Sequence, residues 1–270
     1  MRKIAFIGVG NMANAIICGI LRTGIVDHAH LILSDRFPEK CTPYVQKGAL
    51  SAFTVAEAAA GADCIVLSVK PQNFPEILPE LATVAGIQNK LIITIAAGIS
   101  TETVQKALLG APVVRAMPNT PMLIGMGVSA LCHTPNVSDE DFAYARSVFE
   151  ASGSVTVLDE SDMNRIISVT GSSPAYVFAF INAIREGAIA QGMDGDGLME
   201  SICDVVIGSA TLLKTGGLTP EEQIKVVTSK GGTTERAMNV LRERDLTATV
   251  VEAMQACTNR AEEMGRSSGN

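Results

Sequence analysis

The first half of the chain alternates short apolar runs with segments long enough to form helices, and this alternation limits the folds that it can adopt. The apolar runs, rich in β-branched residues, lie at 3–8, 30–35, 63–69, 90–96 and 112–117. Runs that are apolar on both faces are typical of parallel strands covered by helices on each side. The intervening segments, 11–24, 37–48, 54–61, 74–86 and 100–109, are long enough to be crossover helices. The alternation predicts an α/β domain with a doubly wound sheet.

The pattern changes near residue 160. A weaker strand pair is predicted at 126–132 and 154–158, with a helix at 139–153 between its members. From Ser161 onward the sequence predicts helices alone, at about 173–192, 197–214, 219–228, 233–243 and 245–264. We therefore predict two domains, an α/β domain over 1–160 and an all-helical domain over 161–270.

One predicted helix is apolar on nearly every side. It contains the segment VFAFINAI at 177–184. Such a helix needs burial all round, which is more than a helical domain of this size easily provides. We expect the helical domain to form a homodimer through this surface; packing of the helix against the α/β domain is the alternative.

Composition argues against nucleic-acid and membrane partners. The chain has 21 Lys and Arg against 28 Asp and Glu, a net charge of −7, no Trp, and no basic run longer than two residues. A phosphate-backbone surface or a base-stacking platform needs the opposite. No uninterrupted apolar stretch approaches the length of a membrane span, and the 6 cysteines show no C-x-x-C spacing. We expect a cytoplasmic protein with reduced thiols.

A glycine-rich segment connects the first predicted strand to the first predicted helix. It spans 8–13 and reads GVGNMA, which fits the pattern G-x-G-x-x-A. Gly8 permits a tight turn, Gly10 lets a pyrophosphate approach the backbone, and Ala13 lets the helix pack on the strand. The helix N-terminus offers unpaired N–H groups and partial positive charge to the phosphates. This predicts a Rossmann-like dinucleotide-binding domain; a glycine turn used only for packing is the alternative.

The end of the second predicted strand leaves the choice of dinucleotide open. Ser34, Asp35 and Arg36 stand side by side there. An acidic residue at this place favours NAD by binding the ribose, whereas an adjacent Ser or Arg favours NADP by binding the 2′-phosphate. Both kinds are present, so we expect NADP or NAD as the cofactor.

Three further loops follow strands at the edge where open α/β sheets bind ligands. They contain 69–72 (VKPQ), 96–98 (AAG) and 115–121 (RAMPNTP). Small residues at 96–98 suit the approach of a flat ring, and two prolines can hold Asn119 at a site. The alternative is ordinary turn chemistry, but we include Asn119 among the cofactor-binding residues.

The helical half contains a candidate anion site at 228–234, which reads TSKGGTT. A glycine pair with hydroxyl residues opens a helix there, and exposed N–H groups can bind an anion without a cation. A simple helix cap is the alternative, as it is for 170–176 (TGSSPAY). The only three histidines lie outside these loops, and no set of residues has metal-ligand spacing, so we predict no metal site.

Six segments in this order resemble the pyrroline-5-carboxylate reductase family. They read FIGVGNMANAI, SVKPQ, TIAAGIS, RAMPNTP, TGSSPAYVFAFINA and TSKGGTTERAMNVL, and the resemblance covers about residues 4–260. It implies an NAD(P)H-dependent oxidoreductase that reduces the imine (S)-1-pyrroline-5-carboxylate to L-proline, the last step of proline biosynthesis. It also implies a homodimer interlocked through the helical domain, often assembled further, with helices of the partner completing the site.

The resemblance also assigns residues. The dinucleotide is expected on Ile7, Gly8, Val9, Gly10, Asn11, Met12, Ser34, Arg36, Val69, Lys70, Pro71, Ala96, Ala97 and Gly98. The substrate carboxylate is expected on Ser229, Gly232 and Thr233, and the hydroxyl of Thr234 is expected to reach the ring nitrogen as the catalytic group.

The chain departs from the family pattern at two places. Lys230 stands where the family usually has proline, and 193–197 (MDGDG) replaces a more usual basic stretch. The alternatives are a reductase of another cyclic imine or a β-hydroxyacid, and a non-catalytic dinucleotide sensor. A β-hydroxyacid dehydrogenase needs a lysine early in the helix after 171–174, and this chain has none there until Lys214.

Overall fold

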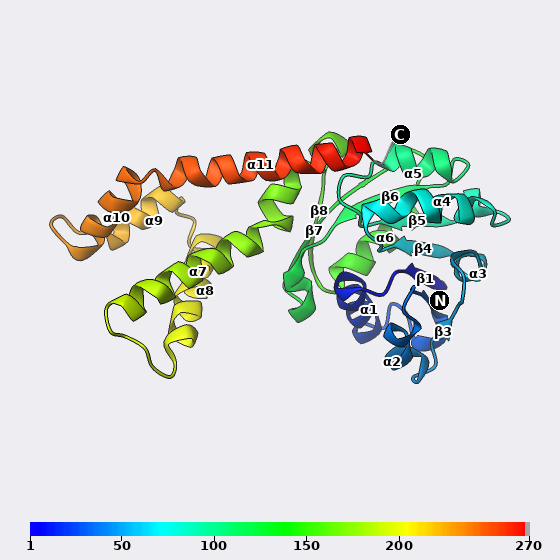
Figure 1. Ribbon diagram of the computed structural model, residues 1–270, viewed down its shortest axis with the longest axis horizontal. Coiled ribbons are helices and arrows are strands. Elements are labelled where there is room, and N and C mark those ends of the chain that lie inside the picture. The colour runs from blue at the N-terminus through cyan, green and yellow to red at the C-terminus, as the bar shows by residue number, and fades with distance from the viewer. Residues whose placement is uncertain (268–270) are drawn as a thin grey trace. The chain divides into compact units, whose positions relative to one another are not determined.

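The computed structural model describes residues 1–267 and divides into two compact units (Figure 1). The first unit comprises Met1–Ser172 together with the chain from Ala256 onward. The second comprises Ser173–Gln255. The last helix, α11 (Leu246–Ser267), begins in the second unit and ends in the first.

The first unit is built on a mostly parallel sheet. Its strands are β1 (Ile4–Ile7), β2 (Leu31–Ser34), β3 (Leu50–Ser51), β4 (Cys64–Leu67), β5 (Leu91–Thr94), β6 (Val113–Met117), β7 (Gly127–His133) and β8 (Gly153–Val157). Their order in the sheet is β3-β2-β1-β4-β5-β6-β7-β8. Neighbours are parallel except β6 and β7, which are antiparallel. The strand order reverses beside β1, which is where doubly wound sheets bind ligands.

Helices cover both faces of this sheet. They are α1 (Asn11–Arg22), α2 (Thr42–Val45), α3 (Val55–Ala60), α4 (Phe74–Ala82), α5 (Thr101–Ala107) and α6 (Asp139–Glu150). Alternate strand residues point to opposite faces, so Phe6 packs with α1 and α6, whereas Ile7 packs with α3, α4 and α5. All four residues of β1 are buried, as expected of a central parallel strand. The predicted doubly wound architecture is confirmed.

The crossover predicted as a helix over 37–48 is broken. It forms a short 3-10 turn, Pro38–Lys40, and the single turn of α2. Proline has no N–H to donate, so Pro38 and Pro43 each fit only the first turn of a helix. The next strand, β3, was not predicted, because it has two residues, both exposed, and therefore no apolar pattern.

The second unit is helical throughout its described residues. It contains α7 (Ser173–Ala190), α8 (Leu198–Gly216), α9 (Pro220–Val227), α10 (Thr233–Glu243) and the first part of α11. Helix α7 packs against α8. A capping box between Thr219 and Glu222 starts α9, which lies within the helix predicted over 219–228. A π-helical turn, Ile167–Gly171, precedes α7.

Candidate functional site

The glycine loop between β1 and α1 uses its two glycines differently. Gly8 has φ +94°, and a Cβ there would lie 2.8 Å from Val69 Cγ1 and 2.9 Å from the Ser68 carbonyl oxygen. At Gly10 nothing lies within 4 Å of the Cβ position. Gly10 is also the N-cap of α1 and supplies no side-chain cap, so N–H groups of the first turn face open space. Packing requires Gly8, whereas Gly10 leaves room for a phosphate.

Ser68 fixes the shape of this loop. Its hydroxyl donates to the Gly8 carbonyl at 2.6 Å and lies 3.0 Å from the Ile7 carbonyl. Sequence reasoning missed this residue, although it immediately precedes the predicted 69–72 loop. Its place at the end of a parallel strand was the available signal.

Asp35 is bound to the same loop. Its carboxylate accepts the Val9 N–H at 2.7 Å and the Phe37 N–H at 2.9 Å, and its Oδ1 lies 3.3 Å from Lys40 Nζ. The side chain is only 8% exposed. Its oxygens therefore hold the backbone around the glycine loop, and the expected contact of Asp35 with a ribose stays a prediction. Within residues 1–267, the side chains of Ser34 and Arg36 at the end of β2 make no such hydrogen bond.

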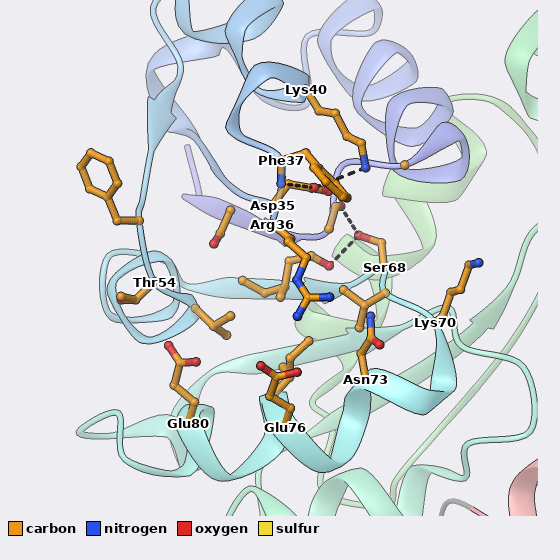
Figure 2. A pocket seen from close by; sticks show the side chains of 18 residues that line it. Asp35, Arg36, Phe37, Lys40, Thr54, Ser68, Lys70, Asn73, Glu76 and Glu80 are labelled. Atoms are coloured by element: carbon orange, nitrogen blue, oxygen red, sulfur yellow. Dashed lines mark hydrogen bonds and ion pairs between the residues drawn. The ribbon is translucent and has the colours of Figure 1, made fainter.

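A cavity of about 610 Å³ opens beside these residues. Figure 2 shows the connection after β2 on one side of it and helix α4 on the other. Predicted cofactor residues that line it are Ile7, Gly8, Gly10, Ser34, Asp35, Arg36, Val69 and Lys70. Phe37, Lys40, Asn73 and Glu76 also line it and were not predicted. Phe37 and Lys40 lie in the connection after β2, Asn73 lies in the connection after β4, and Glu76 lies in the first turn of α4.

A second hollow of about 230 Å³ continues past the 69–72 loop. It is lined by Met12, Pro71, Ile95, Ala96, Ala97 and Pro118, and it shares Ser68, Val69 and Lys70 with the larger cavity. The two hollows therefore meet along the carboxyl ends of β1, β4 and β5. An extended two-part ligand suits this arrangement.

Gly98 has a structural reason to be glycine, and its assignment to the cofactor stays a prediction. A Cβ on Gly98 would lie 2.8 Å from the Ala261 carbonyl oxygen and 2.9 Å from the Gly265 nitrogen, both in α11. The backbone has φ +77° there. Gly98 is thus required for packing of α11 on the α/β unit, whereas Ala96 and Ala97 line the second hollow.

The side-chain amide of Asn119 forms hydrogen bonds within the protein. Its Oδ1 accepts the Val128 N–H at 2.9 Å, and its Nδ2 donates to the Thr170 carbonyl at 3.0 Å. The residue is buried. Its amide therefore ties β6 and β7 to the π-helical turn, and it lines neither hollow.

Arg115, on β6, also joins distant parts of the first unit. The guanidinium of Arg115, which is only 2% exposed, pairs with Glu160 at 2.6 Å and donates to Asn164 at 2.7 Å. Burial raises the pKa of Glu160, but hydrogen bonds from Arg115, Cys132 and Thr101 outweigh it and hold that pKa below its ordinary value. The 115–121 segment thus anchors the chain that leads toward α7.

The remaining predicted residues of the first unit line neither hollow. Val9 is buried and gives its N–H to Asp35, while Asn11 is the exposed first residue of α1. Among residues 1–267, no three His, Cys, Asp or Glu residues gather as metal ligands do.

The 228–234 loop of the second unit opens α10 much as the glycine loop opens α1. Gly232 is the N-cap and provides no side-chain cap. Two amides are already used, since the Gly231 N–H donates to Glu235 and the Gly232 N–H to the Ser229 carbonyl. The free donors are therefore the first-turn amides from Thr233 onward, with exposed Ser229 beside them. Thr234 is half-buried, and its hydroxyl has no hydrogen bond within residues 1–267.

Comparison with known families identifies both halves of the chain. Residues 160–264 match the family described as "Pyrroline-5-carboxylate reductase dimerisation". Residues 3–98 match "NADP oxidoreductase coenzyme F420-dependent". The pyrroline-5-carboxylate reductase of Vibrio alginolyticus is 37% identical over 97% of both chains. That of Escherichia coli K12 is 34% identical over 98% of this chain and 99% of its own.

The chain belongs to the pyrroline-5-carboxylate reductase family. Solved structures agree with this assignment. The pyrroline carboxylate reductase of Plasmodium falciparum, solved with NADP bound, has a TM-score of 0.90 at 25% identity over 98% of both chains. The Coxiella burnetii enzyme has a TM-score of 0.87 at 30% identity, over 97% of this chain and 98% of its own. The resemblance stated from the sequence is confirmed, and membership in the family brings a dimerisation domain.

One helical stretch in the described part passes a membrane-span test of length and composition. It covers Ile167–Ala190, and only 11% of its most apolar part is buried. Most of this stretch is α7, which falls within the family's dimerisation region.

Proposed function

We propose that this chain reduces (S)-1-pyrroline-5-carboxylate to L-proline with NADPH or NADH, the last step of proline biosynthesis. The observation that supports this most directly is the open space at Gly10, beside an uncapped helix N-terminus, in a member of the reductase family. This open space supports an enzyme that can bind the phosphates of a dinucleotide.

The residues present fit a nicotinamide dinucleotide. The larger cavity, with Ser34 and Arg36, holds the adenosine half, and the first turn of α1 binds the pyrophosphate. The second hollow, walled by Met12 and the alanines at 96 and 97, holds the nicotinamide half. When bound, the reduced cofactor would supply a hydride to the carbon of the protonated imine, whose nitrogen keeps its proton and becomes the amine; the protein supplies orientation and charge.

The 228–234 loop binds the substrate. Its first-turn amides from Thr233 onward, with Ser229, receive the carboxylate, because a helix N-terminus favours an anion. The Thr234 hydroxyl forms a hydrogen bond to the ring nitrogen and orients the imine. Functionally, residues 1–160 bind the dinucleotide, and residues 161–270 bind substrate and form the dimer.

The proposal is tested with purified protein, pyrroline-5-carboxylate, and NADPH or NADH, following the loss of nicotinamide absorbance. We expect turnover, with proline as the product. Dinucleotide binding without turnover on this substrate or other cyclic imines would contradict the enzyme assignment and favour a sensor.

The helical unit is proposed to form a homodimer, with further assembly of dimers, in the cytoplasm and without membrane or nucleic-acid partners. Its helices α7 and α8 carry large apolar side chains that are exposed in the single chain. Among them are Val177, Phe178, Phe180, Val205, Ile207 and Leu212. Uncovered apolar surface of this extent is typical of an obligate interface.

A charge placed in this surface is expected to separate the protomers. We expect Phe178→Glu to weaken association by at least about 100-fold, because a carboxylate loses water at an apolar contact. Phe178 is 63% exposed, and Leu109 of the α/β unit is equally exposed at 63%, so Leu109→Glu is the matched control. Light scattering after size exclusion gives the mass of each. A Phe178→Glu protein with the wild-type mass would contradict the interface.

Arg36 is expected to read the 2′-phosphate. We expect Arg36→Ala to raise the KM for NADPH by about 10-fold, the size of one charged hydrogen bond, and to change that for NADH little. Steady-state kinetics with each cofactor measures both values. Equal losses with the two cofactors would show that Arg36 does not contact the phosphate.

A further inference from the structure

Lys40 lies in the same cavity as Arg36 and has not been given a role. It ends the 3-10 turn Pro38–Lys40, four residues beyond Arg36, and lines the cavity shown in Figure 2. Its Nζ lies 3.3 Å from Asp35 Oδ1 and 4.7 Å from the centroid of the Phe37 ring. The Lys40 side chain is 43% exposed, whereas Asp35 is 8% exposed. The ammonium group thus sits at the mouth of the cavity, on a buried carboxylate.

Asp35 does not depend on this ion pair. Its two oxygens already accept the N–H groups of Val9 and Phe37, at shorter distances than the contact with Lys40. An ion pair with a partly exposed lysine contributes little to stability. The long, flexible lysine side chain can therefore leave Asp35 for a stronger anion without disturbing the glycine loop.

Charges around the cavity restrict where such an anion can lie. On the side of α4, Glu76 and Glu80 line the cavity, and the Glu80 carboxylate accepts the Ala56 N–H at 2.9 Å. On the other side, Arg36 and Lys40 follow β2, and the Arg36 guanidinium makes no hydrogen bond or ion pair within residues 1–267. A phosphate is repelled by the first side and attracted by the second. The end of β2 is also where dinucleotide folds place the ribose 2′ position.

We propose that Lys40 is a specificity-determining residue, which turns from Asp35 to the 2′-phosphate of NADPH and completes with Arg36 a two-cation site. This inference rests on the proposed function and deepens it by assigning a phosphate-bearing dinucleotide as the preferred cofactor. Phe37 holds the lysine over its ring in the free protein and shortens the movement required. Asp35 is the competitor for the same ammonium group.

The test uses calorimetry on the full chain with two small probes, 2′,5′-ADP and 5′-AMP, which differ only in the 2′-phosphate. We expect the wild type to prefer 2′,5′-ADP. Lys40→Met should reduce that preference about 10-fold and leave 5′-AMP binding unchanged, because one charged contact is lost. Lys40→Arg should keep most of it. Lys47→Met is the control, since Lys47 is exposed and lies outside the cavity lining.

Asp35→Asn is expected to change the preference for 2′,5′-ADP in the opposite direction. The amide oxygen still accepts the Val9 N–H, while the NH2 group replaces the oxygen that accepts the Phe37 N–H and costs that one hydrogen bond. The negative charge that competes for Lys40 is gone, so the preference for 2′,5′-ADP over 5′-AMP should increase about 3-fold or more, and the affinity for 5′-AMP shows whether the loop is disturbed. A decrease in this preference would show that Asp35 holds Lys40 where it contacts the 2′-phosphate. It would overturn the proposal that Lys40 leaves Asp35 for the phosphate. An unchanged preference in Lys40→Met, with both probes still bound, overturns the role of Lys40 alone. Binding of neither probe by the wild type overturns the dinucleotide groove as well.

Discussion

Replacing Gly10 with valine is expected to abolish dinucleotide binding without unfolding the protein. No atom lies within 4 Å of the Cβ position at Gly10, and the backbone there is extended, with φ −87° and ψ −176°. Valine adopts this conformation readily, but its side chain fills the space through which a pyrophosphate reaches the first turn of α1. We expect NADPH affinity to fall by at least about 100-fold, or about 2.7 kcal/mol, in calorimetry. The unfolding temperature should fall by no more than about 4 °C, because valine is a poorer N-cap than glycine.

Gly8→Ala provides the contrasting control in the same loop. An alanine there must adopt φ +94° and place its Cβ 2.8 Å from Val69 Cγ1. Strain of this kind costs about 2 kcal/mol, so the unfolding temperature should fall by about 4–8 °C. Calorimetric unfolding compares the two variants. If Gly10→Val binds NADPH as the wild type does, the phosphates do not lie at this loop and the assigned groove is wrong.

The sequence predicts the architecture well because a buried parallel strand can be recognised from the apolar pattern of its own residues. Buried runs such as 3–8 and 63–69 are apolar on both faces, so their pattern survives whatever surrounds them. The edge strand Leu50–Ser51 and the broken crossover before it leave no such record. Their conformation depends on a neighbouring strand and on two prolines, which periodicity does not reveal.

The site is less predictable because the type of a residue does not show whether its side chain contacts the protein or a ligand. Asp35, Gly98 and Asn119 were all assigned to the cofactor from their positions after strands. In the fold, Asp35 holds the glycine loop, Gly98 makes room for α11, and Asn119 joins β6 to the π-helical turn. Each of these partners is distant in sequence, between 26 and 163 residues away for Val9 and Ala261. A loop position is therefore predictable, but the choice between structural and ligand contact is not.

In the 228–234 loop, some backbone amides make contacts within the protein and others stay open to a ligand. The predicted anion site has the expected uncapped helix start, but Glu235 and the Ser229 carbonyl occupy two of its amides. In the proposed complex we therefore expect the substrate carboxylate at the amides from Thr233 onward and not at the glycine pair. This shift places Thr234, the second residue of α10, at the ligand-binding end of the helix.

Removing the Thr234 hydroxyl is expected to reduce turnover strongly while leaving cofactor binding intact. The hydroxyl has no hydrogen bond within residues 1–267, so its loss should not disturb folding. In the proposed complex it contacts the ring nitrogen, where positive charge disappears as the hydride arrives. A contact made at the reacting atoms contributes about 100- to 1,000-fold, and we expect Thr234→Ala to lower kcat by that factor.

Two matched variants decide what this loss means. Thr234→Ser keeps the hydroxyl and should retain most of the activity, whereas Thr228→Ala removes a hydroxyl that already donates to the Ile224 carbonyl at 2.6 Å. Thr228→Ala should therefore lower the unfolding temperature slightly and leave kcat near the wild-type value. If Thr234→Ala keeps the wild-type kcat, the ring nitrogen is oriented by another group. A fall in kcat with an unchanged Kd for NADPH, restored by serine, assigns the hydroxyl to the reacting end of the substrate, because only a contact made during reaction changes kcat alone.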